Sequence, residues 1–405
     1  MNRIRMTVSG ISVAALVVAS ALVAPSIGAG AASSKGTVNV GIICACTGPL
    51  GANYTVGPPA YLAWAKSVNA AGGINGYKVN VISKDDQGNI GVSLAEAKSL
   101  ISQHVVALVD DTNDDTAWAS LAQSANVPVI GGGAVSALPL TNSDFFSAET
   151  TEDVFALAQV ESAKKVGATK IGDLYCAEAP ACAQIVPILQ NTAKALGLTV
   201  AYTKEISASQ PSYAAECLAS KDAGVDFLGI GESSGAVQTA ATDCVQQGFT
   251  PWYSIGDGGV SDSNLTTPGL GTKSIGYETD IPYFLTTRPG MKLYLKAIKK
   301  FAPQILKSPN YGEEAVAMYV SGLLLGKAVQ VGTAGKKGPV TTSEVLKGLY
   351  SIHHDTLGGM APPLTFTAGK PSPVDCWYWI GIHNHKFTTP YGTAPFCKSP
   401  PPGTL

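Results

Sequence analysis

Short apolar runs alternate with segments of helical periodicity along the first third of the chain. Val38 to Ile43 is a continuous apolar run, Tyr61 and Trp64 recur at helical spacing, and a second apolar run covers 79–82. This pattern predicts a strand, a helix that ends at Gly72-Gly73, and a second strand. Further strands are predicted at 105–109 and 127–130, with helical faces at 94–101 and 118–121. Parallel strands need such helical crossovers, so we predict a parallel sheet wound by helices.

The same alternation restarts after Phe145. Strands are predicted at 171–175, 200–202, 227–230 and 252–255, with helices over 183–196, 213–219 and 236–246 between them. Helical segments at 313–329 and 343–349 and a strand-like run at 377–382 follow. Two similar halves, with late segments that return between them, predict an α/β fold of two doubly wound lobes with a hinge and a cleft.

Composition narrows the functional classes. The 405 residues are 45% hydrophobic and 14% charged, with 27 basic and 29 acidic residues and a net charge of −2. So low a charged share excludes a disordered charged tail or a coiled coil. The near-neutral balance supplies no broad cationic surface, so neither nucleic acid nor an anionic membrane is an expected partner.

The N-terminal 32 residues have the features of a secretory signal peptide. Arg3 and Arg5 precede an apolar stretch from Ile11 to Ala24, and small residues follow up to Ala32. The apolar stretch is shorter than the roughly 20 residues that span a bilayer, which disfavours a membrane anchor, the alternative interpretation. No cysteine follows in a lipoprotein context, so we expect export to the periplasm or the cell exterior without a lipid anchor. The most apolar later stretch, 315–331, contains Lys327 and is not expected to span a membrane.

Eight cysteines in an exported chain indicate disulfides. Local spacing favours three pairs, which are Cys176 with Cys182, Cys217 with Cys244, and Cys376 with Cys397. Cys44 and Cys46 remain, either as free thiols or as an unusual local disulfide. Neither the cysteines nor His383-Asn384-His385 have the spacing of metal ligands, so no metal site is predicted.

Four aspartates occur within six residues at 110–115. The segment contains D-x-N-x-D from Asp111, but Thr116 and Ala122 stand where a calcium loop needs glycine and glutamate. Two interpretations remain, solvated charges around a helix start or an acidic wall that selects a cationic ligand. Trp118 either covers a ligand or packs under the sheet, and its helical spacing with Leu121 favours the core.

Three short motifs resemble a known family. They are Thr47-Gly48-Pro49-Leu50-Gly51, Asn69-Ala70-Ala71-Gly72-Gly73-Ile74-Asn75-Gly76, and Asp85-Asp86. The chain resembles, over about 37–386, the type I periplasmic binding proteins of ABC importers, specifically the branched-chain amino-acid-binding group. The resemblance implies two Rossmann-like lobes joined by three crossings, with lobe 1 formed by 36–145 and 281–362 and lobe 2 by 146–280 and 363–405. It further implies a monomer without a cofactor that traps a solute between the lobes and delivers it to a membrane permease.

The resemblance also implies a set of ligand-binding residues. Thr112 and the backbone of 133–135 correspond to carboxylate-binding positions, Tyr54 to a lid, and Asp257 to the partner of an ammonium group, although Asp257 alternatively reads as a plain turn residue. The full set is Tyr54, Thr112, Asn113, Gly133, Ala134, Val135, Ser233 and Asp257. Val135 stands where relatives carry a hydroxyl residue. The expected ligand is therefore a small polar molecule, an amino acid or a related amine or amide.

Gly231-Glu232-Ser233-Ser234-Gly235 supports a different function. It matches the G-x-S-x-G nucleophile elbow and falls between a predicted strand and a predicted helix, as that motif requires. A secreted serine hydrolase would use Ser233, Asp257, His353 or His383, and an oxyanion loop at 131–133. The glycine run lacks the histidine that precedes it in lipases, so we prefer the solute-binding hypothesis, in which no covalent chemistry is required.

Overall fold

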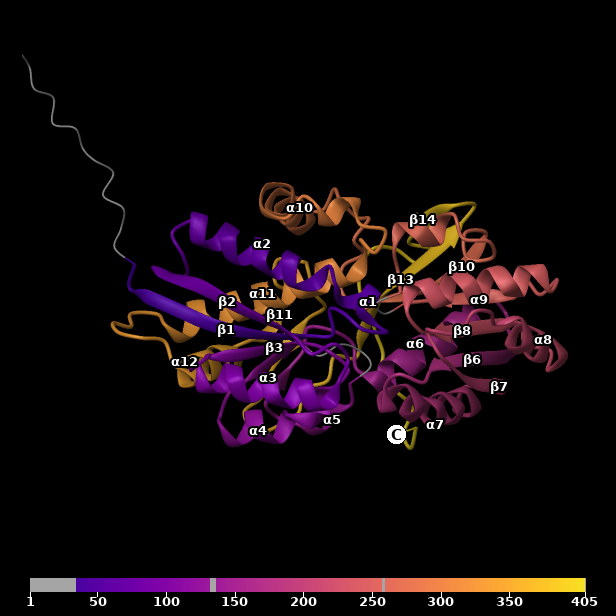
Figure 1. Ribbon diagram of the computed structural model, residues 1–405, viewed down its shortest axis with the longest axis horizontal. Coiled ribbons are helices and arrows are strands. Elements are labelled where there is room, and N and C mark those ends of the chain that lie inside the picture. The colour runs from indigo at the N-terminus through magenta and orange to yellow at the C-terminus, as the bar shows by residue number, and fades with distance from the viewer. Residues whose placement is uncertain (1–33, 132–135, 257–258, 405) are drawn as a thin grey trace, which may run out of the picture. The chain divides into compact units, whose positions relative to one another are not determined.

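A computed structural model describes residues 34–131, 136–256 and 259–404. The predicted signal peptide lies outside the described residues, as do Gly133, Ala134, Val135 and Asp257. The described part contains two large β-sheets, each flanked by helices (Figure 1). This confirms the predicted α/β fold with two lobes, and we call the part built on the first sheet lobe 1 and the part built on the second lobe 2.

The sheet of lobe 1 has five parallel strands in the order β2-β1-β3-β4-β5. They are β1 (Gly36–Cys44), β2 (Tyr77–Asp85), β3 (Ala107–Asp111), β4 (Val129–Gly131) and β5 (Phe145–Phe146). The central β3 is buried along its whole length, as expected for a strand covered on both faces. The predicted strands at 38–43, 79–82, 105–109 and 127–130 are thereby confirmed.

The helices of lobe 1 come from two separate parts of the chain. The early ones are α1 (Gly51–Tyr54), α2 (Gly57–Ala70), α3 (Ile90–Ser102), η1 (Asp115–Ala117), α4 (Ala119–Ser124) and α5 (Leu138–Thr141). The late ones are α10 (Pro289–Phe301), η3 (Ile305–Lys307), α11 (Glu313–Gly332) and α12 (Thr342–Leu349). Both α10 and α11 pack against α2, so segments more than 200 residues apart in sequence share one core.

Helix α2 follows directly from its sequence. Pro58 occupies the first turn, where its missing N–H costs nothing, and Tyr61 and Trp64 are buried on the face toward the core. The chain leaves the helix through Gly72 and Gly73, both at positive φ. A Cβ at Gly73 would lie 2.1 Å from the Tyr77 carbonyl oxygen, so glycine is required there, and the predicted helix end is confirmed.

The sheet of lobe 2 has the order β14-β13-β10-β9-β8-β6-β7, with β15 paired to β13. Its strands are β6 (Lys170–Cys176), β7 (Thr199–Ile206), β8 (Phe227–Gly231), β9 (Trp252–Ile255), β10 (Lys273–Glu278), β13 (Cys376–His383), β14 (Lys386–Thr388) and β15 (Phe396–Cys397). Its helices are α6 (Glu152–Lys165), α7 (Pro180–Ala195), α8 (Ala214–Asp222), α9 (Ser234–Gln246) and η2 (Asp262–Leu265). A separate two-stranded sheet pairs β11 (His353–Asp355) with β12 (Leu364–Thr365).

One edge of this second sheet is antiparallel rather than parallel. Strand β13 runs antiparallel to β10 and turns into β14 through Asn384 and His385, both in the left-handed region. Two residues of positive φ are the requirement of a tight hairpin turn. The segment His383-Asn384-His385 is therefore a turn in this structure.

The chain passes between the two sheets three times, after β5, after β10 and after β12. Phe146 at the first passage contacts Tyr350 and Phe366 edge to face, at centroid distances of 5.6 and 5.3 Å. These contacts bring the first and third passages together. Such multiple crossings form the hinge of a two-lobed protein.

Four disulfides are present among the described residues. Cys176–Cys182, Cys217–Cys244 and Cys376–Cys397 confirm the three predicted pairs. The question left open for Cys44 and Cys46 is answered by a local disulfide between them.

Buried aromatic side chains fill the cores. Trp118 is fully buried, stacks on Phe145 and donates from Nε1 to Ser93 Oγ at 3.0 Å, so it is a core residue and not a ligand cover. Helix α11 is long and apolar enough to cross a membrane despite Lys327, but 72% of its apolar window is buried in the fold. It is the central helix of the lobe 1 core.

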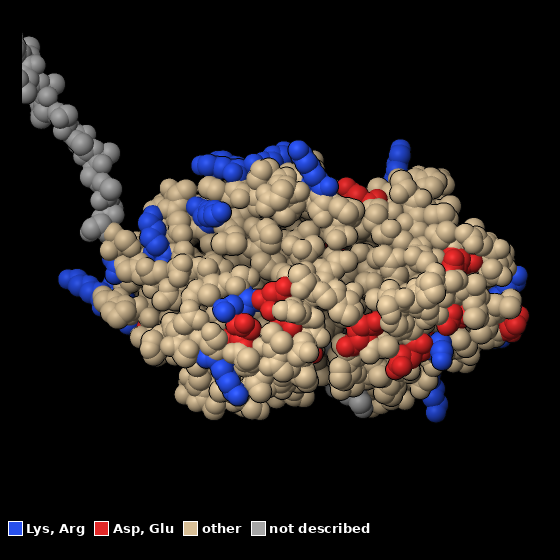
Figure 2. All heavy atoms as spheres, viewed as in Figure 1, with Lys and Arg blue, Asp and Glu red and all other residues tan. Residues whose placement is uncertain are grey.

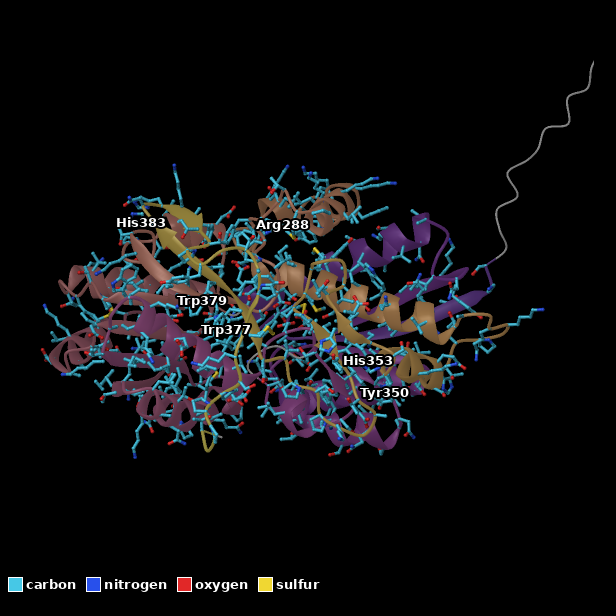
Figure 3. All side chains as sticks on the ribbon, turned by 180° about the vertical axis from the view of Figure 1, so that it is seen from behind. Arg288, Tyr350, His353, Trp377, Trp379 and His383 are labelled. Carbon is cyan, nitrogen blue, oxygen red and sulfur yellow. A yellow bond between two sulfur atoms is a disulfide. The ribbon has the colours of Figure 1, made fainter. Side chains whose placement is uncertain are left out.

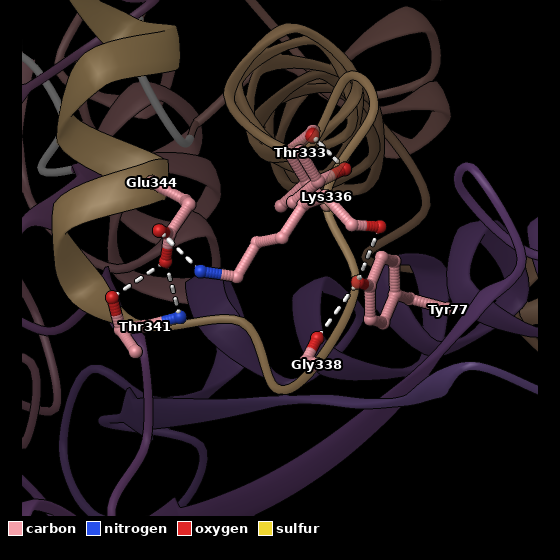
Figure 4. A network of polar contacts seen from close by, with 7 residues as sticks. Tyr77, Thr333, Lys336, Gly338, Thr341 and Glu344 are labelled. Carbon is pink, nitrogen blue, oxygen red and sulfur yellow. Dashed lines mark hydrogen bonds and ion pairs between the residues drawn. The ribbon is translucent and has the colours of Figure 1, made fainter.

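The connection from α11 to α12 is held by a polar network (Figure 4). Thr341 and Glu344 form a reciprocal capping box at the start of α12, and Lys336 forms an ion pair with Glu344. Partial burial raises the pKa of Glu344, but the hydrogen bonds from Lys336 and Thr341 outweigh it and bring the pKa to about 2. Tyr77 donates to the Gly338 carbonyl at 2.7 Å, which fixes this connection to β2.

Candidate functional site

A cavity lies between the lobes, at the carboxyl ends of the parallel strands. Lobe 1 contributes residues that follow β1 and β3, and lobe 2 contributes the ends of β6, β8 and β9. This is where open α/β sheets bind ligands. The volume open to the centres of water molecules is about 130 Å³. One ordered water needs roughly 10–15 Å³ by this measure, so there is room for a small solute.

Carboxylates dominate the polar lining of this cavity. Seven of the described lining residues are acidic, namely Asp110, Asp111, Glu149, Glu152, Asp173, Glu232 and Glu314. No lysine, histidine or described arginine is among the lining residues, although all lysines and histidines lie in the described ranges. Lysine side chains instead gather at the outer surface, for example over α10 (Figure 2). The described interior of the cleft is therefore anionic in character.

The lobe 1 wall is built on the end of β3, where the aspartates of 110–115 begin. Asp110, Asp111, Asp114 and Asp115 are 3 to 9% exposed, so the interpretation of this run as solvated turn charges is wrong. Burial raises the pKa of Asp110 well above its usual range, and the charge of Asp115 raises it further. A run of carboxylates held out of water without a described cation partner supports the second interpretation, an acidic wall.

Hydroxyl groups in this wall are already engaged. Thr112 Oγ1 donates to Asp86 Oδ2 at 2.6 Å and accepts from the Asp114 N–H at 3.2 Å. Ser136 donates to Asp115, and Tyr54 donates to Asn113 Oδ1. The donors are thus turned toward acceptors of the wall itself.

Helix α11 brings a further carboxylate to the same wall. Burial raises the pKa of Asp111 well above its usual range, and the charge of Glu314 in the first turn of α11 raises it again. A Cβ added at Gly57 would lie 2.8 Å from Asp111 Oδ2 and 3.0 Å from Glu314 Oε1. The glycine at position 57 therefore leaves the space that these two carboxyl groups occupy.

The lobe 2 wall contains a buried aspartate in the middle of a strand. Asp173 of β6 accepts from Gln159 Nε2 at 3.2 Å through Oδ1, while Oδ2 has no hydrogen-bond partner among the described residues. Burial raises the pKa of Asp173 to about 6. A Cβ at Gly229 on the neighbouring strand β8 would lie 2.1 Å from Gln159 Nε2, so Gly229 makes this arrangement possible.

A second acidic pair lies at the end of β8. Burial, together with the neighbouring carboxyl group of Glu178, raises the pKa of Glu232 to about 8. At the opposite side of the cavity Glu152, the first residue of α6, has its pKa raised to about 7 by burial and by the charges of Asp153 and Asp115. The charge of Asp115, a lobe 1 residue, thus affects the pKa of a lobe 2 residue.

The predicted ligand-binding residues fall into three groups. Tyr54, Thr112 and Asn113 line the cavity. Ser233 is buried next to it as the residue preceding α9, but it is not among the described lining residues. Gly133, Ala134, Val135 and Asp257 lie outside the described residues.

Sequence reasoning missed the acidic residues of lobe 2. Asp173 lies inside an apolar strand, and Glu149 and Glu152 belong to a crossing and a helix that the apolar pattern did not predict. One usable signal was the absence of any lysine or arginine from 99 to 163. In a sequence segment without lysine or arginine, a carboxylate has no basic residue nearby in the chain with which to form an ion pair.

The nucleophile-elbow motif has no histidine in the cavity. All five histidines are exposed, and none is a lining residue. Figure 3 shows His353 and His383 well apart, His353 beside lobe 1 and His383 on β13 of lobe 2. A Ser-His-Asp arrangement needs its histidine within hydrogen-bond reach of the serine, so this geometry gives the hydrolase hypothesis no support.

The described residues contain one group whose side-chain atoms are close enough to hold a metal ion, formed by Cys44, Cys46 and Asp111. The two cysteines are joined in a disulfide, and a metal needs thiolates. The oxidised pair therefore offers no thiolate to a metal.

Comparisons with known proteins agree with this geometry. The model of a family described as periplasmic binding protein matches residues 37–385. The chain belongs to the periplasmic binding protein family. Membership places it among solute-binding proteins, which are typically non-enzymatic, and implies export to the periplasm or the extracellular space. No curated protein matches the sequence.

Solved structures of this family share the fold at low sequence identity. A branched-chain amino acid ABC transporter protein from Thermus thermophilus with bound valine superimposes with a TM-score of 0.79 at 17% identity, covering 91% of this chain and 98% of its own. A fatty acid ABC transporter substrate-binding protein from Thermomonospora curvata gives 0.73 at 20% identity, with 89% and 92% covered. An ABC transporter substrate-binding protein from Aeropyrum pernix gives 0.75 at 17% identity, with 91% and 97% covered.

Proposed function

We propose that this periplasmic binding protein is the solute-binding component of an ABC importer and captures a small polar molecule between its lobes. The observation that carries the proposal is the cavity lined by strand ends of both sheets. The structural relatives are named as ABC transporter proteins, and the one from Thermus thermophilus holds valine. The cavity is large enough for an amino acid, an amine or an amide.

Binding would proceed by hinge closure. A ligand that contacts both walls stabilises the state in which the lobes meet, because only that state offers all of its contacts at once. Asn53 of lobe 1 already accepts a hydrogen bond from the backbone N–H of Ser234 in lobe 2. A membrane permease then recognises the closed form, which couples capture to transport.

A thermal-shift screen of the purified exported protein tests the proposal. The panel contains amino acids, amides, amines, fatty acids and sugars, and each hit is followed by small-angle X-ray scattering to detect closure. A solute at 100 times its Kd stabilises the folded state by about 2.7 kcal/mol, which is a readily measured rise in Tm. The variant Asn113→Ala alters the cavity, whereas Asn80→Ala alters an exposed pair with Asn39 and serves as the control.

The proposed function predicts that at least one solute raises the Tm and reduces the radius of gyration. Asn113→Ala should diminish that shift, and Asn80→Ala should leave it unchanged. If no solute of the panel changes either quantity, the proposed function is contradicted.

A further inference from the structure

The cavity contains acidic residues on both of its walls. Asp110, Asp111 and Glu314 belong to lobe 1, and Asp173 and Glu232 belong to lobe 2. The four ion pairs found among the described residues are all elsewhere, and none involves a lining carboxylate. The loops 132–135 and 257–258 contain no lysine, arginine or histidine in their sequence. Among the described residues, no side-chain cation forms an ion pair with Asp110, Asp111, Asp173 or Glu232.

Oxygens on both walls are buried without a hydrogen-bond partner. Asp110 lacks one at both carboxylate oxygens, and Asp111 Oδ2, Asp173 Oδ2 and Glu232 Oε1 also lack one among the described residues. The four residues are 3 to 7% exposed. Buried polar atoms are nearly always satisfied in folded proteins, and a buried carboxylate is satisfied best by a cation that donates hydrogen bonds. A ligand with N–H groups would supply what these oxygens lack.

A ligand carboxylate finds few matching groups in this cavity. The hydroxyls of Thr112, Ser136 and Tyr54 already donate to acceptors in the lobe 1 wall. An anion placed beside them would also meet the unpaired carboxylates. The hydroxyl groups of the lobe 1 wall are therefore mismatched to the carboxylate of an ordinary amino acid.

The carboxylates do not converge on one point. A calcium ion needs six to eight oxygens around a single centre. Among the described residues, however, the only group with atoms close enough for a metal is Cys44, Cys46 and Asp111, in which the cysteines are oxidised. The negative charge is instead spread over two walls. Several separated positive charges match such a distribution better than one ion.

Apolar and aromatic side chains complete the lining. Phe155 and Tyr277, which contact each other edge to face, line the cavity together with Ile230 and Met318. Aromatic faces attract ammonium groups, and apolar side chains accommodate methylene groups. The lining therefore matches a chain of methylenes with charged nitrogens along it.

We propose that the ligand is an aliphatic diamine or oligoamine without a carboxylate, with one ammonium group on the Asp110 and Asp111 wall and another on the Asp173 and Glu232 wall. One ammonium carries three donors and can serve one wall, so two walls call for at least two ammonium groups. This inference rests on the proposed solute-binding function and names the substrate class of the same cavity.

Isothermal titration calorimetry of the purified exported protein tests the ligand class. The probes are 1,4-diaminobutane, spermidine, butylamine, L-valine, acetamide, magnesium chloride and calcium chloride. We expect 1,4-diaminobutane or spermidine to bind at least tenfold more tightly than butylamine, which carries one ammonium group. We expect L-valine to bind more weakly than 1,4-diaminobutane and spermidine. Butylamine is the matched control because it has the same four-carbon chain as 1,4-diaminobutane.

Two variants, one on each wall, test the placement of the ammonium groups. Asp110→Asn and Glu232→Gln keep the shape of the side chain and remove its charge, and each should weaken diamine binding roughly 10- to 100-fold. Each should also raise the Tm of the ligand-free protein at pH 8, because burial opposes ionisation of the carboxyl group that is removed. Glu205→Gln, at an exposed position on β7, should change neither quantity. If one variant fails to fold, the variant in the other lobe still tests the proposal.

The possible outcomes separate this inference from the proposed function. Tight diamine or spermidine binding that both cavity variants weaken supports the inference. Binding of L-valine or acetamide in preference to the amines would overturn it and leave the solute-binding function standing. Preference for magnesium or calcium over every amine would also overturn it. If no probe binds here and no solute of the wider thermal-shift panel binds either, both proposals fail.

Discussion

The backbone N–H of Ser234, in the first turn of α9, donates a hydrogen bond of 3.0 Å to Asn53 Oδ1. The two residues belong to different lobes and flank the cavity. The first N–H groups of a helix have no partner within the helix, so Asn53 satisfies a donor that would otherwise need water or a ligand. This bond is a direct polar link across the mouth of the cleft.

Removing this link should favour separation of the lobes. Asn53→Ala deletes the acceptor, and a hydrogen bond of this kind contributes about 0.5–1.5 kcal/mol. We therefore expect a larger radius of gyration for the ligand-free protein and a Kd for its solute that rises roughly three- to tenfold. Small-angle scattering and calorimetry measure the two effects. Asn80→Ala is the control, and equal results for the two variants would remove Asn53 from the closure mechanism.

The buried carboxyl groups predict how stability depends on pH. The folded-state pKa values are about 6 for Asp173, 7 for Glu152 and 8 for Glu232, all above the unfolded values of roughly 4. Between these limits the folded protein binds more protons than the unfolded chain, so stability falls as the pH rises from about 4 to 8. Urea midpoints at pH 5, 6.5 and 8 and constant ionic strength measure this. A midpoint that rises over the range would contradict it.

The variant Glu232→Gln isolates the upper part of that pH range. It removes the carboxyl group whose pKa is about 8, so the loss of stability between pH 6.5 and 8 should become smaller. The exposed control Glu205→Gln should keep the wild-type profile. Glu178 interacts with Glu232 and has its own pKa lowered, so its titration lies below this window.

The disulfide between α8 and α9 should stabilise the fold most strongly through loop closure. Cys217 and Cys244 are 27 residues apart, and a loop of that length corresponds to about 3–4 kcal/mol of unfolded-state entropy. The double variant Cys217→Ala/Cys244→Ala should lose that amount in urea unfolding. Cys44 and Cys46 are two residues apart, so the matching double variant should lose much less. Equal losses would contradict the loop-entropy explanation.

The capping box of α12 gives a local prediction in the network of Figure 4. Thr341→Ala removes both the cap and a partner of Glu344, and such caps contribute about 1 kcal/mol. Ser343→Ala, at an exposed position in the first turn of the same helix, is the control. A loss in Thr341→Ala that does not exceed the control would show that this cap is dispensable.

Periodicity sufficed to predict most of the fold but not every element. The strand at 38–43 and the helix that contains Tyr61 and Trp64 follow from burial on one or both faces. Helix α6 was not predicted because its own residues are buried on nearly all of its faces. Its sequence therefore lacks the single apolar stripe that periodicity detects. Strand β10, in which glycine, serine and two charged residues leave only Ile275 and Tyr277 as large apolar side chains, gave a similarly weak pattern.

The sequence predicted the acidic residues of one wall of the candidate site but not those of the other. The aspartates at 110–115 are adjacent in the chain, so their cluster is visible, but whether they face water or a cavity depends on distant elements such as α11. Asp173 lies in β6 and Glu232 directly follows β8, so the two come to the same cavity only when the sheet of lobe 2 forms. A carboxylate in the middle of an apolar strand conflicts with the burial of that strand, and such a conflict indicates a functional position. Asp173 is the example in this chain.

A chain of net charge −2 would be judged electrostatically featureless, yet its charges are segregated. Lysines of α10 face solvent, and carboxylates line the cleft. Low-dielectric walls focus the electric field of these carboxylates toward the opening of the cleft. The association rate of a positively charged solute should therefore be higher at low ionic strength. It should fall once added salt shortens the Debye length below about 8 Å. The buried acidic residues would then affect the association rate constant of the solute more than its Kd.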